Sequence, residues 1–215
     1  MYYSDAHRGL FLRPVLYAII LPMSQENSLA IPNMRKLIVL PLFSALIAAG
    51  AYIALPIGPV PLVLQNFFVV LSGLVLGPAP GAASVCLYIL MGSIGLPVFA
   101  GGTGGIAHFA APSAGYLVSY PAAAALAGII SARRRKKPHL APYVKEAGAA
   151  LAASFFILAA GVTWLKIRLG LDWYKALAVG FLPFIAGDII KSLAAAVLAP
   201  RIRLIFRTEG LCAEK

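Results

Sequence analysis

Long apolar runs separated by short polar stretches dominate this chain, and six of the runs are long enough to cross a membrane. A membrane-spanning helix needs about 20 mostly apolar residues, and somewhat fewer where neighbouring helices cover it. The pattern therefore predicts an all-α integral membrane protein, a bundle of six transmembrane helices. The runs cover roughly residues 36–55, 62–77, 81–96, 114–132, 147–168 and 174–200.

Two connections between these runs are unusual for membrane loops. Residues 96–117, LPVFAGGTGGIAHFAAPSAGYL, are too apolar for a solvated linker and too rich in glycine and proline for a helix. Irregular backbone near a membrane is tolerated where protein or a cavity covers it, so we expect a re-entrant or capping external loop. Residues 55–68 contain three prolines, which favour a stiff, extended loop. The sequence GPAPG at 77–81 predicts a tight turn between two helices.

Composition agrees with the membrane assignment. Of the 215 residues, 61% are hydrophobic and 12% charged, whereas soluble domains carry about 25% charged residues. The net charge of +11 does not indicate a nucleic-acid-binding protein, because no basic face is interleaved with aromatic residues. The histidines and cysteines show no spacing typical of metal ligands. We therefore expect no metal, no cofactor and no nucleic acid partner.

The basic residues predict the orientation. They gather before the first run, in RRRKK at 133–137, and after the last run. The positive-inside rule places these regions in the cytoplasm, so both termini of this multi-pass cell-membrane protein are expected inside. We expect residues 1–33 to be an interfacial or disordered leader with Met34 as an alternative start, 34–205 to form the membrane domain, and 206–215 to be a cytoplasmic tail.

Asp188 and Lys191 are the most informative residues, because they interrupt the last apolar run. A charge at the centre of a membrane helix costs about 2.5–3.5 kcal/mol, and a spacing of three residues places both side chains on one helix face. They can form a self-neutralising pair that is merely tolerated, or the polar end of a ligand cavity. In a cavity, lysine suits a carboxylate and aspartate accepts N–H groups.

Other candidates surround this pair or lie in the first run. Ser44, Ala45, Ala48 and Ala49 form small-residue pairs that favour close helix packing, either within the bundle or with a partner. His108 is expected to be an ordinary loop residue. Further candidates for ligand contact are the aromatic, amide and glycine-loop residues Gln65, Tyr88, Phe99, Gly101, Gly102, Thr103, Gly104 and Tyr116. Helix capping is the alternative for Gln65, and anchoring at the membrane interface is the alternative for the two tyrosines.

Four motifs together resemble one family. PVPLVLQNF, YILMGSIGLPVFAGGTGG, GYL and PFIAGDIIKSLAA occur in this order. They resemble BioY, the biotin-specific substrate-binding S component of energy-coupling factor (ECF) transporters, over roughly residues 36–200. The chain departs from the family's usual GPTGGYL with AAPSAGYL at 110–117.

The resemblance implies an external biotin pocket capped by the first and third connections. It implies that Asp188 and Lys191 form the polar end of this pocket, and we assign Lys191 to the biotin carboxylate and Asp188 to the urea N–H groups, an assignment that can be reversed. It also implies that small residues of the first helix dock an ECF coupling subunit, which works with two ATPase subunits. Some members of the family act alone, and the sequence does not distinguish the two modes.

Three other functions compete with biotin uptake. The first is an S component for another carboxylated vitamin, such as lipoate or pantothenate. The second is a membrane enzyme that uses Asp188 as an acid or base, but the sequence offers no second catalytic carboxylate and no nucleophile–base pair, so we expect no enzyme. The third is a structural membrane subunit, which would have no use for a buried ion pair.

Overall fold

The computed structural model describes residues 38–55, 59–133 and 142–208. The chain divides into two units, Met1–Ile38 and Val39–Lys215, and everything described here beyond Ile38 belongs to the second. The expected leader at 1–33 and most of the expected tail at 206–215 therefore lie outside the described residues.

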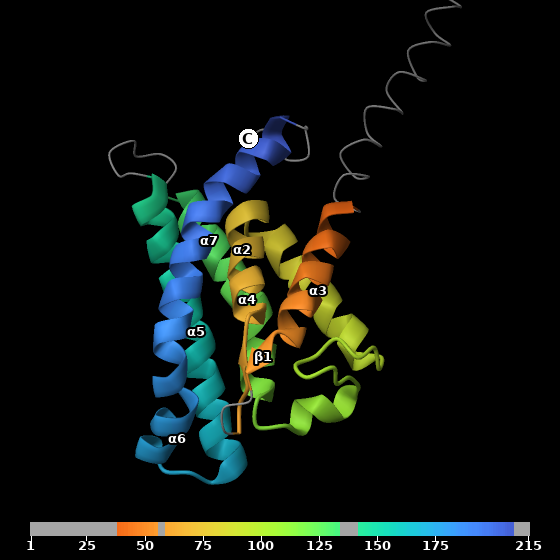
Figure 1. Ribbon diagram of the computed structural model, residues 1–215, viewed down its shortest axis with the longest axis vertical. Helices are drawn as coiled ribbons and strands as arrows, with labels where there is room; N and C mark the ends of the chain where they lie inside the picture. The colour runs from red at the N-terminus through yellow and green to blue at the C-terminus, as the bar shows by residue number, and fades with distance from the viewer. Residues whose placement is uncertain (1–37, 56–58, 134–141, 209–215) are drawn as a thin grey trace, which may run out of the picture. The chain divides into compact units, whose positions relative to one another are not determined.

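Helices make up nearly all of the described structure (Figure 1). The exceptions are two short paired strands and the connection between residues 94 and 113, which contains one short 3₁₀ helix. In chain order the elements are a first helix over Ile38–Tyr52, β1 (Ala54–Leu55), β2 (Leu62–Val63), α2 (Gln65–Leu76), α3 (Pro78–Ser93), the 3₁₀ helix η1 (Ile106–Ala110), α4 (Ala114–Arg133), α5 (Pro142–Leu169), α6 (Trp173–Gly180) and α7 (Leu182–Thr208).

Three helices are long and apolar enough to cross a membrane by themselves, and they lie within α4, α5 and α7. Three shorter apolar helices accompany them: the first helix, α2 and α3. The expectation of an all-α membrane protein is thus met in its coarse form. Each predicted run contains helix, but only half of the runs contain a helix of full spanning length.

The last predicted run is divided into two helices, so the prediction of one continuous helix over 174–200 is wrong. α6 ends at Gly180 and α7 begins at Leu182, with Phe181 between them at φ −123° and ψ −57°. Pro183 explains the break, because proline lacks an N–H and its ring would clash with the carbonyl four residues earlier in a continuous helix. α7 then continues through Pro200 to Thr208, beyond the predicted end of the run.

Glycines allow α2 and α3 to pack closely. The two helices are separated by Gly77 alone, at φ +91°, which confirms the predicted tight turn. A Cβ atom on Gly81 of α3 would lie 2.8 Å from the Cα of Gly73 in α2, closer than real Cβ contacts. Gly73 in turn abuts the backbone of Ala124 in α4. Because glycine has no Cβ atom, the backbones of these three helices can approach one another closely.

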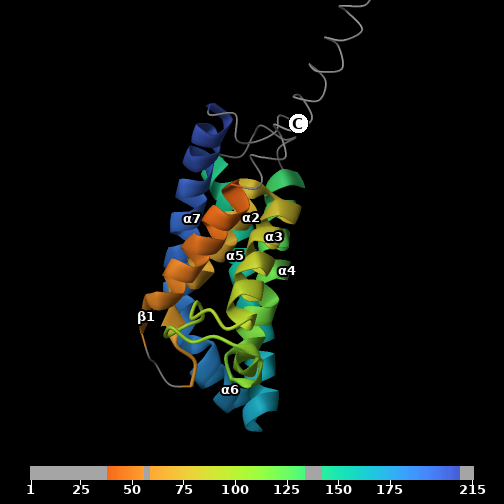
Figure 2. The same cartoon turned by 90° about the vertical axis from the view of Figure 1, so that its right-hand side faces the viewer.

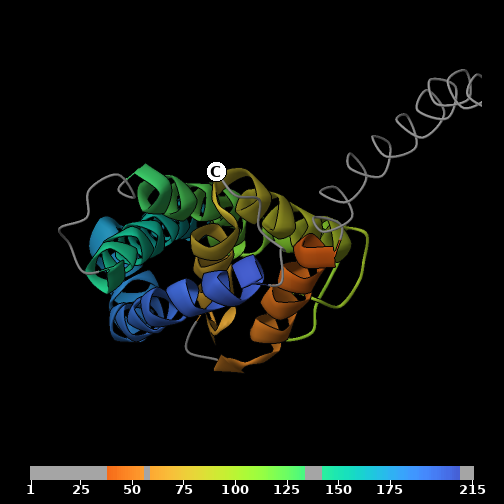
Figure 3. The same ribbon diagram turned by 90° about the horizontal axis from the view of Figure 1, so that it is seen from above.

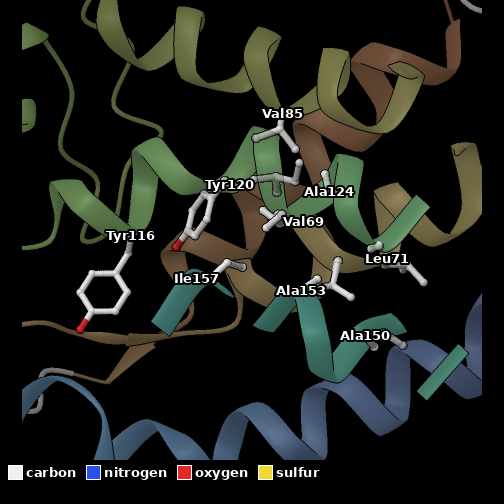
Figure 4. Close-up of a cluster of buried hydrophobic side chains, with 14 of the residues drawn as sticks. Val69, Leu71, Val85, Tyr116, Tyr120, Ala124, Ala150, Ala153 and Ile157 are labelled. Carbon is white, nitrogen blue, oxygen red and sulfur yellow. The ribbon is translucent and has the colours of Figure 1, made fainter. Parts of the chain in front are cut away.

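Small residues also line the contact between α4 and α5. Buried alanines from both helices face the core, together with larger apolar side chains of α2 and α3 (Figure 4). In the end-on view α2 lies between α4 and α7 (Figure 3), and it contacts both. The C-terminal end of α7 lies at one end of this unit, and β1 and α6 lie at the other (Figure 2).

Candidate functional site

A small cavity lies where the start of α2, the later part of α3, the start of α4 and the connection between α3 and α4 meet. Its volume is about 40 Å³, whereas pockets for drug-sized ligands measure about 300–1,000 Å³. The cavity is therefore too small for a ligand of vitamin size in the described conformation, and at least one wall has to move to admit one. The polar and aromatic side chains of the wall are Gln65, Asn66, Tyr88, Phe99, His108, Ser113, Tyr116 and Tyr120.

Three tyrosine hydroxyls at the cavity are already hydrogen-bonded within the protein. Tyr88 donates to the carbonyl of Val98 at 3.1 Å. Tyr116 donates to the carbonyl of Gly180 at 2.6 Å. Tyr120 donates to Asn66 Oδ1 at 2.7 Å. Because a hydroxyl has one proton, these oxygens can only accept further hydrogen bonds.

The predicted ion pair is formed within α7. Asp188 Oδ1 lies 2.5 Å from Lys191 Nζ, and the two side chains are 4% and 11% exposed. Lys191 Nζ also donates to the carbonyl of Val63 in β2 at 3.1 Å. The Asn66 side chain interacts with the Asp188 carboxylate from α2, but neither carboxylate oxygen makes a hydrogen bond of good geometry to the described residues. The two charges therefore compensate each other, while the hydrogen-bonding capacity of the carboxylate is not filled.

The ion pair adjoins the small cavity without lining it. Asn66 and Val63, the neighbours of Asp188 and Lys191, are themselves part of the cavity wall. On its other side Asp188 reaches an apolar groove of about 260 Å³ between α5 and α7. Leu158 lines both spaces, so one leucine side chain stands between the cavity and the groove.

The connection between α3 and α4 covers the cavity and is tied to three helices. Tyr52 of the first helix donates its hydroxyl hydrogen bond to the carbonyl of Pro97. From α5, Trp164 Nε1 donates to the carbonyl of Ala111 at 3.1 Å, and Arg168 Nε donates to the carbonyl of Ala110 at 2.6 Å. The Tyr88 hydroxyl of α3 holds the same connection through Val98. The connection is thus a fixed, irregular cover.

Of the predicted residues in this connection, Phe99 lines the cavity. It is fully buried, stands edge-on to Tyr88 with ring centroids 5.7 Å apart, and fills the space that a side chain at Gly92 would need. Gly101 and Gly102 have φ of +73° and +71° and make the turn that returns the chain to Thr103, which pairs with Phe99. Gly101, Gly102, Thr103 and Gly104 are not among the residues of the cavity wall.

The structure thus brings together four of the predicted contact residues: Gln65, Tyr88, Phe99 and Tyr116. Tyr120 also lines the cavity but was not predicted from the sequence. It follows Tyr116 by one helical turn and therefore shares its face of α4 (Figure 4). His108 was expected to be an ordinary loop residue, yet it also lines the cavity.

The small residues of the first helix face two directions. Ser44 is fully buried and donates to the carbonyl of Ser84 in α3 at 2.6 Å. Ala48 is buried as well, whereas Ala45 and Ala49 are exposed. Ser44 and Ala48 therefore pack within the chain, and only Ala45 and Ala49 offer a surface to a partner.

Comparison with known proteins gives a consistent result. A model of the BioY family matches residues 23–208. A probable biotin transporter BioY of Pyrococcus horikoshii is 43% identical over 162 residues, covering 75% of this chain and 92% of the relative. The biotin transporter BioY of Thermotoga maritima is 42% identical over 170 residues, covering 79% and 96%. A crystal structure of the S-component for biotin from an ECF-type ABC transporter matches with a TM-score of 0.73 at 30% identity, covering 80% of this chain and 92% of that one.

Proposed function

The chain belongs to the BioY family, and from this premise we propose that it binds biotin on the external side of the cell membrane and carries it across as the S component of an ECF transporter. The family is one of transporters, so the protein is a transport protein and not an enzyme. The observation that carries the proposal is a small aromatic and amide cavity beside a buried ion pair.

The chemistry of this site suits the parts of biotin. Phe99 and the tyrosines offer apolar surface to the thioether bicycle, Lys191 offers a cation to the valerate carboxylate, and Asp188 offers an acceptor to the urea N–H groups. To reach biotin, Lys191 has to leave the carbonyl of Val63, and the cavity has to widen toward the ion pair. In the reversed assignment, Asp188 lies nearer the carboxylate end of biotin. Comparing the binding of biotin and of its methyl ester to a Lys191 variant distinguishes the two assignments.

The proposed topology places all six apolar runs in the membrane. The C-terminal end of α7, with Arg201 and Arg203, would face the cytoplasm together with both termini. At the opposite end, Trp173 and Tyr174 are exposed, and Lys166 lies over the Trp173 ring at 5.0 Å. Exposed Trp and Tyr are typical of both membrane–water interfaces, so they support a position of this end at a membrane surface. The external side follows from the basic residues at the opposite end.

We also propose that transport requires an ECF coupling subunit and two ATPase subunits. Ala45 and Ala49 present an exposed small-residue face on the first helix, which allows close approach of a partner helix. Replacing either with Trp should leave biotin binding intact and block uptake in cells that contain the partner complex. Ala194→Trp, on an exposed position of α7, is the matched control and should spare both. Equal losses of binding and uptake would assign the two alanines to packing instead.

Titration of the purified protein with biotin, lipoate and pantothenate tests the function directly. We expect saturable binding of biotin and none of the other two, and biotin that co-purifies with the protein from membranes. Binding of lipoate or pantothenate without biotin would favour the alternative, an S component for another carboxylated vitamin.

A further inference from the structure

His108 is held rigidly at the wall of the cavity. It lies in η1, and its ring stacks at a tilt of 33° on Phe99, with ring centroids 4.8 Å apart. Phe99 is fully buried and packs against Tyr88 and Gly92. The orientation of the imidazole is therefore fixed by packing before any ligand arrives.

Thr103 determines which nitrogen of His108 carries the proton. The Thr103 hydroxyl donates its single proton to the carbonyl of Ala100 at 3.1 Å. Its oxygen also lies 3.3 Å from His108 Nδ1, so this second contact requires Nδ1–H to donate to Oγ1. In the neutral ring Nε2 is then an acceptor, and it has no hydrogen-bond partner within residues 38–55, 59–133 and 142–208.

The neutral form prevails near pH 7, because partial burial lowers the pKa of His108 below its ordinary value of 6.5. On the cover, Arg168 of α5 donates to the carbonyl of Ala110, two residues after His108. α2 and α3 carry no acidic or basic residue, and across the cavity Asp188 and Lys191 of α7 neutralise each other. The other titratable groups toward the cavity are the hydroxyls of Tyr88, Tyr116 and Tyr120, which are hydrogen-bonded.

Gln65 supplies the complementary group. Its side chain is buried beside the Tyr88 hydroxyl, and its Nε2 makes no hydrogen bond of good geometry to the part of the chain that the structure describes. The cavity thus presents one unfilled acceptor and one unfilled donor on rigid elements. A urea presents the matching pair, an N–H donor and a carbonyl acceptor.

We propose that His108 Nε2 accepts a hydrogen bond from one urea N–H of the bound ligand and that His108 is thereby a specificity-determining residue. Gln65 Nε2 donates to the urea carbonyl, and the second urea N–H remains for Asp188. This inference rests on the proposed function, because it takes biotin as the ligand.

Two substitutions of His108 separate this role from a packing role. Gln places an amide oxygen near the position of Nε2, whereas Asn reaches only as far as Nδ1. A buried donor left without its acceptor costs about 1–3 kcal/mol, so His108→Asn should bind biotin roughly 5- to 150-fold more weakly at pH 7.5. His108→Gln should bind within a few-fold of the wild-type protein. Calorimetric titration of the detergent-purified full chain measures both.

The pH profile provides the second readout. Wild-type affinity should fall as the pH is lowered through the pKa of His108, because the protonated ring has no acceptor left. Both variants should lose this dependence between pH 7.5 and 5. Wild-type affinity in His108→Asn, or an acid-side loss that persists in His108→Gln, would overturn the inference while leaving biotin binding in place. Absence of biotin binding by the wild-type protein would overturn the proposed function and this inference with it.

Discussion

Removing the charge of Lys191 while Asp188 stays in place is the most informative perturbation of this protein. Lys191→Met keeps an unbranched apolar stem but removes the ammonium group, so the carboxylate is left without a cation. Asp188→Asn does the reverse, and the double variant removes both charges. Together with the wild-type protein, the three variants form a double-mutant cycle, which measures the interaction energy of the pair separately from the effect of each single substitution.

The expected magnitudes follow from the burial of the two side chains. Breaking a buried ion pair by removing one partner costs about 3–5 kcal/mol, because the remaining charge is left uncompensated. We expect Lys191→Met to lie in this range, since the Asp188 side chain is only 4% exposed and too short to reach water. Asp188→Asn should cost less, because Lys191 is 11% exposed, has a long stem and keeps the carbonyl of Val63.

The double variant separates stability from function. Replacing both members of a buried pair by neutral groups is often close to neutral for stability, so the double variant should recover most of the unfolding free energy while binding no biotin. Unfolding by titration with sodium dodecyl sulfate, monitored by circular dichroism, measures the first quantity, and ligand titration the second. A double variant as unstable as the sum of the single variants, or one that still binds biotin at wild-type affinity, would refute the reasoning.

Three further predictions concern the ligand, the opposite end of the unit and the helix packing. Lys191→Ala should weaken binding of biotin much more than binding of its methyl ester in parallel titrations. Equal losses of affinity would show that Lys191 does not contact the biotin carboxylate. Glu146 Oε1 and Arg203 Nη2 lie 2.7 Å apart with side chains 5% and 12% exposed, so Glu146→Gln should cost about 3 kcal/mol of unfolding free energy. Exchanging Glu146 and Arg203 should restore part of this unfolding free energy. A Glu146→Gln variant as stable as the wild-type protein would contradict the prediction. Gly81→Ala should destabilise by about 1–3 kcal/mol by pressing on the backbone of α2. Gly148→Ala, with no atom within 4 Å, should be neutral or stabilising, and equal unfolding midpoints for the two would contradict the packing argument.

The fold was predictable wherever apolar length alone decides it. The helices of the membrane domain were located by their runs, and the sequence GPAPG that starts at Gly77 indicated the turn between α2 and α3. The break between α6 and α7 was missed because both sides of it are apolar, so only Pro183 could have revealed it. The strands β1 and β2 were missed because two residues are too few to show an alternating pattern.

The site was predictable for residues whose chemistry is unusual in a membrane. The spacing of Asp188 and Lys191 was enough to expect contact between them, and they lie 2.5 Å apart. The pair adjoins the small cavity through Asn66 and Val63. This position depends on how α7 packs against α2 and β2, and the sequence of α7 alone does not predict that packing. His108 was passed over because a histidine in a glycine-rich loop has no pattern of its own, and its role depends on Phe99 and Thr103.

Recognition in this cavity depends on the groups whose hydrogen-bonding capacity the protein leaves incomplete. The hydroxyl protons of Tyr88, Tyr116 and Tyr120 already have acceptors, so a ligand gains little by replacing those acceptors, because one hydrogen bond is exchanged for another. Gln65 Nε2 and the Asp188 carboxylate make no hydrogen bond of good geometry to the described residues, although the carboxylate is paired with Lys191. A ligand that fills this capacity adds hydrogen bonds of good geometry, whereas Lys191 must first give up the carbonyl of Val63 and loosen its contact with Asp188 to reach a ligand carboxylate. Polar specificity should therefore come mainly from the urea end of the ligand, and the carboxylate should contribute the difference between two ionic partners of Lys191.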